Sequence, residues 1–468
     1  MNILDNDTIV ALATPSGGAI GVIRLSGPSA ITITNNLFCA TRKDCTLLET
    51  KGNMLQYGVL RSKDGEELDD VVVSVYRAPH SYTGEDCVEI SCHGSAYILQ
   101  QVLQSLVASG ARQARPGEYT LRAYLNGKMD LSQAEAVADI IAATNKATHK
   151  LALSQLKGHF SGELEKLRAQ LLKLTSLIEL ELDFSDHEEL EFADRGDLKK
   201  LATAIHSRLS TLARSFETGA AIKKGIPVAI IGKTNVGKST LLNKLLHEDK
   251  AIVSDVHGTT RDVIEDTIDI HGVTFRFIDT AGLRKTQDRV ERIGIERTYH
   301  KMSEAAIILW VVDADPTASE LEQLMGHAKD KKVIVVHNKI DLSSRKDNLE
   351  GLIETDCSTW PSNVTHVRVS AKHAIGLDTL EQKVYEVADI PEIDENSVIV
   401  TNTRHYEALT KAKASVERLI ESMDMNLSGD LLAEDLRQCL DELAEITGGS
   451  ITSTEVIHNI FNHFCIGK

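Results

Sequence analysis

The sequence predicts an α+β N-terminal domain, an all-α helical domain, and an α/β domain inserted into the helical one. Three observations lead to this architecture. The first part of the chain carries short apolar runs between turn residues. Two later parts are rich in alanine and leucine at helical spacing, and the part between them alternates apolar and helical runs. At 468 residues, the chain is long enough for about three domains.

Composition excludes several classes of protein. No apolar run reaches the roughly 18–20 residues that span a bilayer, and residues 1–7 lack the basic-then-apolar pattern of a signal peptide. The seven cysteines have no framework spacing, which is typical of reduced thiols. We therefore expect a cytoplasmic protein without a membrane span. The net charge of −17 argues against binding of nucleic acid over the whole surface, although a local basic patch or a basic partner stays open.

The α+β domain is expected over residues 1–125. Its predicted strands are the apolar runs Thr8–Ala13, Ala19–Leu25, Val71–Val75 and Val88–Ser91, which Gly, Pro and Asp turns separate. Helical spacing of apolar residues predicts one helix over Ala96–Ala108.

The helical domain is expected over residues 126–222 and 390–468. Apolar residues recur every three or four positions at Leu164, Leu167, Leu171, Leu174 and Ile178, and again at Leu432, Leu436, Leu440 and Leu443. Thr452 and Glu455 resemble a helix N-cap before a last helix through Phe464. We expect one domain that receives the insertion, with two independent helical domains as the alternative. The acidic run 183–197 is either a solvated face or a binding surface.

The inserted domain, residues 223–389, opens with a phosphate-binding loop. Residues 232–239 match G-x-x-x-x-G-K-[ST] between an apolar strand and a helical run, where a chance glycine-rich turn is the alternative. Gly232 and Gly237 permit the sharp turn, Lys238 reaches the β- and γ-phosphates, and Ser239 ligates Mg²⁺. Buried parallel strands are predicted at Val228–Ile231, Phe275–Ile278, Ala306–Val312 and Lys332–Val336.

Four further short motifs follow in order, and together they identify the nucleotide as GTP. Thr259 and Thr260 lie where a switch loop closes over the γ-phosphate. Residues 279–282 read Asp-Thr-Ala-Gly, a Mg²⁺ and γ-phosphate motif. Asp341, in Asn-Lys-Ile-Asp, can accept guanine N1–H and its 2-amino group, which adenine lacks, and residues 370–372 approach the guanine O6. The inserted domain is therefore expected to be a Ras-like P-loop GTPase domain.

The residues that we expect to bind GTP are Gly232, Asn235, Val236, Gly237, Lys238, Ser239, Thr240, Ser254, Thr259, Thr260, Asp279, Thr280, Ala281, Gly282, Asn338, Lys339, Asp341, Ser370, Ala371 and Lys372, with Mg²⁺ at Ser239 and Thr260. Leu283 stands where Ras-like enzymes carry a glutamine that orients water. The catalytic group must therefore come from elsewhere, or hydrolysis is very slow. Arg284, Glu291 and Arg292 are the candidates, and the alternative for each is a surface charge.

Several strings together resemble the MnmE (TrmE) family of tRNA modification GTPases over essentially the whole chain. They are Asp7–Ala11, Arg115–Thr120, Asn126–Leu131, Gly258–Asp262, Val290–Glu296 and Cys465–Lys468. The resemblance implies a homodimer whose G domains meet across the nucleotides in the presence of K⁺, which Asn235, Ser254, Val256 and Thr259 would hold. It makes Glu291 the catalytic residue, beside Lys238 and Arg284.

The resemblance also implies a folate site at Arg24, Glu89, Lys128 and Lys468, for 5-formyltetrahydrofolate or methylene-tetrahydrofolate. Cys465 is either a nucleophile or a packed thiol. The implied function is GTP hydrolysis that, with the partner MnmG in a heterotetramer, adds an aminomethyl or carboxymethylaminomethyl group to C5 of the wobble uridine of certain tRNAs. The alternatives are a ribosome-assembly GTPase and a folate-dependent scaffold with a vestigial GTPase.

Overall fold

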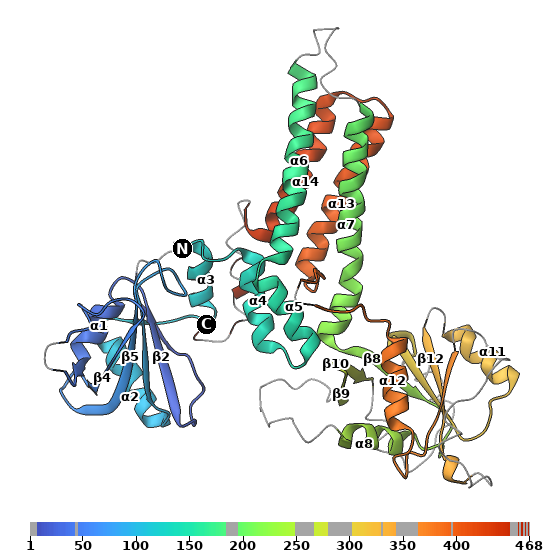
Figure 1. Ribbon diagram of the computed structural model, residues 1–468, viewed down its shortest axis with the longest axis horizontal. Coiled ribbons are helices and arrows are strands. Elements are labelled where there is room, and N and C mark those ends of the chain that lie inside the picture. Colours follow the sequence, from blue (N-terminus) through green and yellow to red (C-terminus); the bar gives the residue numbers. More distant parts are fainter. Residues whose placement is uncertain are drawn as a thin grey trace. The chain divides into compact units, whose positions relative to one another are not determined.

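The computed structural model describes residues 7–42, 45–183, 195–248, 266–278, 302–328, 331–342, 364–394 and 396–449, together with Ile457, Ile460, Phe461, Phe464 and Gly467 (Figure 1). The chain divides into two compact units. The first comprises Met1–Ala142, Ala152–Ser210 and Glu407–Lys468, and the second comprises Ala143–Leu151 and Thr211–Tyr406.

The first unit contains a mixed sheet whose strands, among the described residues, run in the order β3-β4-β5-β6-β2-β1-β7. These strands are β1 (Ile9–Leu12), β2 (Ile20–Ser26), β3 (Phe38–Ala40), β4 (Met54–Arg61), β5 (Glu67–Tyr76), β6 (Cys87–His93) and β7 (Arg112–Gln113). Neighbours are antiparallel except β1 and β7, which are parallel. The predicted strands at β1, β2, β5 and β6 are confirmed, whereas β3, β4 and β7 had no sequence prediction.

One face of this sheet is covered by α1 (Ala30–Leu37) and α2 (Ala96–Ala108). Val71, Val73 and Val75 of β5 are buried and alternate with partly exposed residues, which is the period expected of a strand with one covered face. Leu99 and Val102 of α2 lie in the same hydrophobic cluster as these valines. Helix α2 has the bounds that the apolar spacing predicted.

Four long helices of the chain form a bundle (Figure 1). They are α6 (His159–Asp183), α7 (Arg195–Lys224), α13 (Thr403–Asp424) and α14 (Gly429–Thr447). Contacts between side chains of neighbouring helices close a ring. Three are ion pairs: Arg208–Glu163 joins α7 to α6, Arg418–Asp435 joins α13 to α14, and Arg437–Glu179 joins α14 to α6. The fourth is the hydrogen bond between His206 and Glu417, which joins α7 to α13. The predicted seam from Leu164 to Ile178 is buried.

The bundle settles how the helical segments are related. Helices α6 and α7 precede the α/β segment, and α13 and α14 follow it, yet all four pack together. The insertion is therefore confirmed, and the alternative of two independent helical domains is wrong. The domain boundaries at residues 125, 222 and 390 stay predictions.

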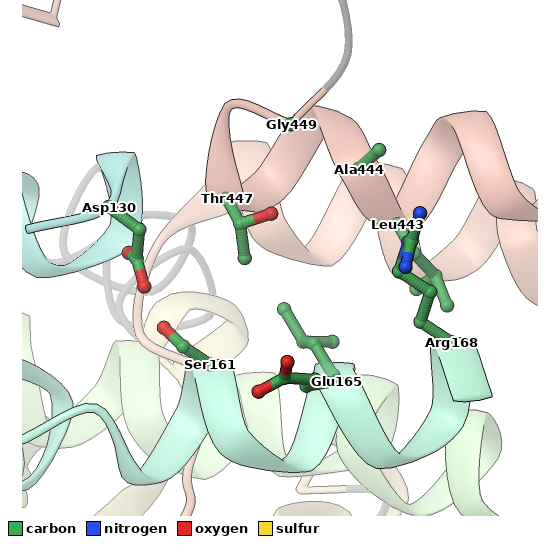
Figure 2. Close-up of a pocket in the computed structure, with 9 residues that line it drawn as sticks. Asp130, Ser161, Glu165, Arg168, Leu443, Ala444, Thr447 and Gly449 are labelled. Atoms are coloured by element: carbon green, nitrogen blue, oxygen red, sulfur yellow. The ribbon is translucent and has the colours of Figure 1, made fainter. Parts of the chain in front are cut away.

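A cavity of about 310 Å³ opens between α6 and α14 (Figure 2). Its lining comprises Asp130, Ser161, Leu164, Glu165, Arg168, Leu443, Ala444, Thr447 and Gly449. Asp130 precedes α4 (Leu131–Ala142) and accepts a hydrogen bond from Ser132. The cavity lies among none of the residues that the sequence predicted to bind a ligand.

The second unit contains a six-stranded sheet in the order β13-β12-β11-β8-β10-β9 within its described part. The strands are β8 (Ile226–Ile231), β9 (Asp266–Ile270), β10 (Val273–Phe277), β11 (Ile307–Val312), β12 (Lys332–His337) and β13 (Val364–Arg368). All neighbours are parallel except β9 and β10. The four predicted strands of this domain are confirmed as parallel.

Alternate residues of the central strands enter two different hydrophobic clusters, so both faces of the sheet are covered. Val228 and Ile230 of β8 lie in one cluster with α8 (Lys238–Glu248) and α12 (Leu377–Val387). Ala229 and Ile231 lie in the other cluster, with α11 (Ala318–His327). This is a doubly wound α/β sheet, in which ligands bind beyond the carboxyl ends of the strands where strand order reverses. The order reverses at β8, directly before the predicted phosphate loop.

Candidate functional site

The loop from Gly232 to Ser239 has a backbone that its two glycines make possible. Gly232 and Gly237 have φ of 144° and 99°, in the region that side chains disfavour. A Cβ atom would lie 2.2 Å from the Val311 carbonyl oxygen at Gly232, and 2.2 Å from Asn338 Nδ2 at Gly237. Asn235 also has a positive φ, 63°, and its side chain is exposed. The turn therefore needs glycine at both of its ends.

Lys238 begins α8 and arches back over this loop. Its Nζ donates hydrogen bonds to the carbonyl oxygens of Gly232 and Lys233, at 2.7 and 2.6 Å. The ammonium group therefore lies above the loop, where it can meet a phosphate. Ser239 and Thr240 follow in the first turn of α8.

Asn338 connects the phosphate loop to the segment around Ala371. Its Nδ2 donates to the Val236 carbonyl at 2.8 Å, and its Oδ1 accepts from the Ala371 N–H at 3.0 Å. Asn338 is buried, so each of these bonds would be costly to lose. The side chain that follows β12 thus positions two loops that are distant in sequence.

Asp341 lies just after β12, in the short 3₁₀ helix η1 (Ile340–Leu342). The buried Ser370 hydroxyl donates to Asp341 Oδ1 at 2.7 Å, and this bond lowers the pKa of the carboxyl group. Asp341 is therefore ionised at neutral pH and acts as an acceptor only. Lys339, which pairs with Asp313 at 3.2 Å, completes the motif. An aspartate oriented in this way suits the two adjacent N–H donors of guanine.

The predicted folate residues Arg24 and Glu89 form an ion pair at 2.7 Å. They are directly opposite one another on β2 and β6, so their side chains share one face of the sheet. The Arg24 guanidinium carbon lies 5.7 Å from the ring centroids of Tyr82 and Tyr119. Tyr119 donates to the Arg24 carbonyl at 2.6 Å, and burial raises the pKa of its hydroxyl.

Lys128 approaches this group through a loop. Its Nζ donates to the Pro79 carbonyl at 2.9 Å, and a Cβ at Gly84 would lie 3.4 Å from its side chain. The loop from Pro79 to Gly84 also carries Tyr82. Near the C-terminus, the Gly467 carbonyl accepts from Arg24 Nη1 at 3.5 Å. The structure thus joins Arg24 and Glu89 directly, ties Lys128 to the loop beside them, and places Gly467 at the same point.

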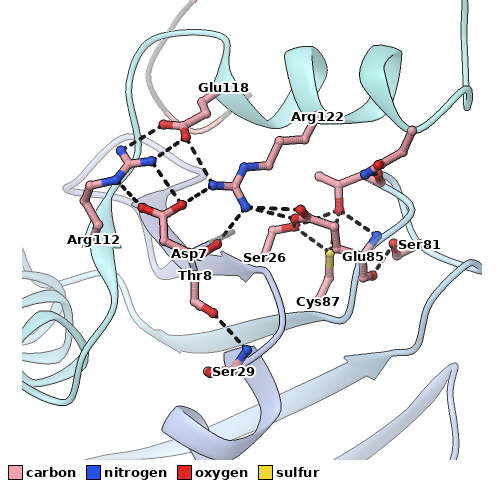
Figure 3. Close-up of polar contacts among 12 residues, drawn as sticks. Asp7, Thr8, Ser26, Ser29, Ser81, Glu85, Cys87, Arg112, Glu118 and Arg122 are labelled. Carbon is pink, nitrogen blue, oxygen red and sulfur yellow. Dashed lines mark hydrogen bonds and ion pairs between the residues drawn. The ribbon is translucent and has the colours of Figure 1, made fainter. Parts of the chain in front are cut away.

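An ionic network centred on the buried side chain of Arg122 supports this domain (Figure 3). Arg122 of α3 (Glu118–Leu125), whose side chain is 6% exposed, pairs with Asp7 at 2.6 Å, Glu85 at 3.1 Å and Glu118 at 3.2 Å. Arg112 pairs with both Asp7 and Glu118. Burial alone would raise the pKa values of Asp7 and Glu118, but the hydrogen bonds from the arginines outweigh it and lower both.

Comparisons with known proteins agree with this geometry. Residues 8–128 match the model of the GTP-binding protein TrmE N-terminus, and residues 131–465 match that of the MnmE helical domain. The tRNA modification GTPase MnmE of Phocaeicola vulgatus is 52% identical over 100% of both chains. That of Bacteroides thetaiotaomicron is 54% identical over 99% of this chain and 100% of its own. The chain belongs to the MnmE family.

The chain is therefore a GTP-binding enzyme, a tRNA modification GTPase of the MnmE family. Solved structures with a likeness to part of the chain include the G domain of the T. maritima FeoB iron transporter and Aquifex aeolicus Era. The first is 26% identical over 35% of this chain and 99% of its own, with a TM-score of 0.24. The second is 22% identical over 51% and 99%, with a TM-score of 0.26. Among the described residues, no helix is both long and apolar enough to cross a membrane.

Part of the predicted site lies outside the described residues. This applies to Ser254, Val256, Thr259, Thr260, Asp279, Thr280, Ala281, Gly282, Leu283, Arg284, Glu291, Arg292, Cys465 and Lys468, to most of the acidic run, and to the N-cap at Thr452. Their predicted roles stay predictions.

Sequence reasoning missed several residues that shape the two sites. Tyr82 and Tyr119 frame Arg24. Tyr119 lies in the string Arg115–Thr120, but nothing in the sequence places either ring beside Arg24. Lys233, an unspecified position of the loop pattern, pairs with Glu320 at 2.6 Å. A local signal existed only for Glu320, because Thr317 and Glu320 form a capping box that the pattern T-x-x-E predicts.

Proposed function

We propose that this GTPase acts with MnmG to add an aminomethyl or carboxymethylaminomethyl group to C5 of the wobble uridine of certain tRNAs. The part of this proposal that concerns GTP binding rests on one observation, the hydrogen-bonded bridge through Asn338. It ties the phosphate loop at Val236 to the loop of Ala371, beside the Asp341 carboxylate that we expect to bind guanine. One buried side chain thus sets the spacing between phosphate recognition and base recognition.

In this proposal the phosphate loop supplies most of the charge complementarity for GTP. Lys238 moves from the loop carbonyls to the phosphates, and the Ser239 hydroxyl, with Thr260, holds Mg²⁺. Hydroxyl and carbonyl oxygens are ligands that suit this hard cation. When bound, Mg²⁺ neutralises charge on the phosphoryl group. Glu291 orients the attacking water, assisted by Arg284, because Leu283 cannot.

Potassium is proposed to bind beside the loop, at Asn235, Ser254, Val256 and Thr259. The exposed side chain and positive φ of Asn235 support this role, since its amide oxygen is available at the outer edge of the loop. A cation there contributes what an arginine finger contributes in other GTPases, when the G domains of two copies meet.

A folate is proposed to bind at Arg24, Glu89, Lys128 and Lys468 as the one-carbon donor, 5-formyltetrahydrofolate or methylene-tetrahydrofolate. The Glu89 carboxylate can accept two N–H groups from a pterin, and the cationic side chains suit its glutamate tail. The partly exposed Arg24–Glu89 pair, 21% and 27% exposed, supports this, because a ligand can reach it.

The same face of the sheet supports the proposed homodimer. Leu55 lies opposite Ser74, which lies opposite Glu89, so the three residues and Arg24 form one row across the sheet. Leu55 is exposed, as are Tyr57 and Ile20 near this row. Such an apolar surface suits contact with a second copy. We place the dimer in the cytoplasm, in a heterotetramer with MnmG.

The test is the modification state of the wobble uridine in cells that lack this protein. Cells complemented with the wild-type chain or with Lys244→Ala, a variant of α8 outside the loop, should regain the modified nucleoside in tRNA digests. Cells complemented with Lys238→Ala should not. Normal modification with Lys238→Ala would show that the GTPase is dispensable and would contradict the proposal.

The potassium part has its own test in vitro. GTP hydrolysis by the wild-type chain should be much faster in KCl than in NaCl at equal ionic strength, and Asn235→Ala should remove the difference. Equal rates of the wild-type chain in the two salts would exclude Asn235 from catalysis.

A further inference from the structure

The β9–β10 hairpin joins the two segments that are expected to respond to the nucleotide. The segment with Thr259 and Thr260 precedes β9, which begins at Asp266, and the segment from Asp279 to Gly282 follows β10. A shift at either end is therefore transmitted along the hairpin by the chain itself. The elements that contact this hairpin are therefore the ones that such a shift can displace.

The hairpin is held by α5 (Lys146–Leu156) through one buried side chain. Asn145, which is 8% exposed, donates from Nδ2 to the Thr274 hydroxyl on β10 at 2.8 Å. Its Oδ1 accepts from the Thr148 N–H at 2.8 Å and so caps the N-terminus of α5. Both ends of one amide are engaged, one by the helix and one by the strand.

Two further contacts join α5 to the hairpin. The Ala147 N–H, one of the amides that the start of a helix leaves without an intrahelical acceptor, donates to the Gly272 carbonyl in the hairpin turn at 2.9 Å. Ala147 and Leu151 are buried in the same hydrophobic cluster as Ile268 and Val273 of the hairpin. The first turns of α5 thus pack as part of the G-domain core.

Helix α5 continues beyond this contact. Residues up to Leu151 belong to the unit of the G domain, and residues from Ala152 belong to the unit of the helical bundle. An α-helix is stiff along its axis, so movement of its first turn is carried to its last. Helices α7 and α13 also cross between the units, after Ser210 and after Tyr406.

We propose that Asn145 couples the nucleotide state of the G domain to helix α5 through its hydrogen bond to Thr274. Asn145 is a positioning residue: it touches neither nucleotide nor tRNA. Its side chain links β10 to the start of α5, so that a displacement of the strand also displaces the helix. Because it is buried, its amide stays bonded only if helix and strand shift together. This inference rests on the GTPase activity and is independent of the chemistry of tRNA modification.

The test is hydrogen exchange of the full chain, measured by mass spectrometry with GDP and with GDP, aluminium fluoride and K⁺. In the wild-type chain, peptides that cover residues 146–156 should exchange at different rates in the two states. Thr274→Val removes the hydroxyl at nearly constant volume and should abolish this difference, while Thr274→Ser keeps the hydroxyl and should retain it. GDP affinity and the GTPase rate, measured in parallel, report separately on the site itself.

Two more variants distinguish loss of the Asn145–Thr274 hydrogen bond from general destabilisation of the contacts around the hairpin. Asn145→Ser keeps an N-cap oxygen for α5 but cannot reach Thr274, so it should lose the difference without unfolding the helix. Gln382→Ala removes a different contact of the hairpin, the 2.8 Å bond from His271 to α12, and should keep the difference. An unchanged difference in Thr274→Val and Asn145→Ser, an equal loss in Gln382→Ala, or no difference in the wild-type chain would overturn the proposal.

Discussion

The phosphate loop and the Arg24–Glu89 site are built in opposite ways. The loop is one stretch of eight residues whose backbone follows from two glycines and a helix start. Arg24 and Glu89 are 65 residues apart in sequence and meet only because β2 and β6 are neighbours. The first site is a property of local chain geometry, and the second is a property of the folded sheet. Remote substitutions should therefore damage the second site more readily than the first.

The largest effect is expected from Arg122→Met. The substitution leaves Asp7, Glu85 and Glu118 without their shared cation, and breaking a buried pair in this way costs about 3–5 kcal/mol. Calorimetric unfolding of the first unit should move to lower temperature, whereas GDP affinity should stay at the wild-type value.

The control for Arg122→Met is Arg61→Met, which removes an exposed pair with Glu67 and should change stability by no more than about 1 kcal/mol. If Arg122→Met weakened GDP binding as much as it destabilised the first unit, the contrast between the two regions would be lost.

Asn338→Ala should have the next largest effect, and it acts on the nucleotide site. It removes two hydrogen bonds and leaves the Val236 carbonyl and the Ala371 N–H unpaired, so GDP affinity should fall by about 10- to 100-fold. Isothermal titration calorimetry measures this loss. Asn243→Ala, on the exposed side of α8, should bind GDP normally. Unchanged affinity in Asn338→Ala would mean that the loop keeps its shape without the bridge.

Acid should destabilise the first unit by a smaller and gradual amount. The pKa values of Asp7 and Glu118 are lowered in the folded state from 3.8 and 4.5, so their contribution to stability is complete above those values. It is lost as pH falls through the lowered values, because the carboxylates must then be protonated. Denaturant unfolding at a series of pH values from 6 downward measures this loss. The loss should be visible from about pH 4. Glu118→Gln should flatten this dependence, and an unchanged slope would exclude Glu118.

The smallest effect on stability is expected from Glu89→Gln. The Arg24–Glu89 pair is partly exposed, so its loss should cost less than about 1 kcal/mol of unfolding free energy. Binding of 5-formyltetrahydrofolate, followed by calorimetry, should nevertheless be lost, because an amide has one acceptor oxygen and an NH2 donor where a carboxylate has two acceptor oxygens. Glu67→Gln, in the exposed pair on the same sheet, is the matched control and should bind normally. Normal folate binding by Glu89→Gln would count against the proposed site.

Local sequence patterns were enough to predict the phosphate loop, the central strands of the α/β domain, helix α2 and the apolar seam of α6. Each depends on residues that are close in the chain, where dihedral preferences and the period of burial act directly. The order of the G-domain strings was also readable, because the strings at Gly232, Asp279, Asn338 and Ser370 each follow a strand. The roles of Glu291, Thr260 and Lys468 remain predictions from the sequence.

Which distant groups meet depends on how the sheets and helices pack. The sequence marked Asn338 as part of a guanine motif, but its bridge from Val236 to Ala371 depends on how two loops pack. Asn145 had no motif at all, and its bond to Thr274 spans 129 residues. The reason is physical: a side chain can bond to a remote partner only when the sheet register and the helix packing bring that partner within hydrogen-bonding distance.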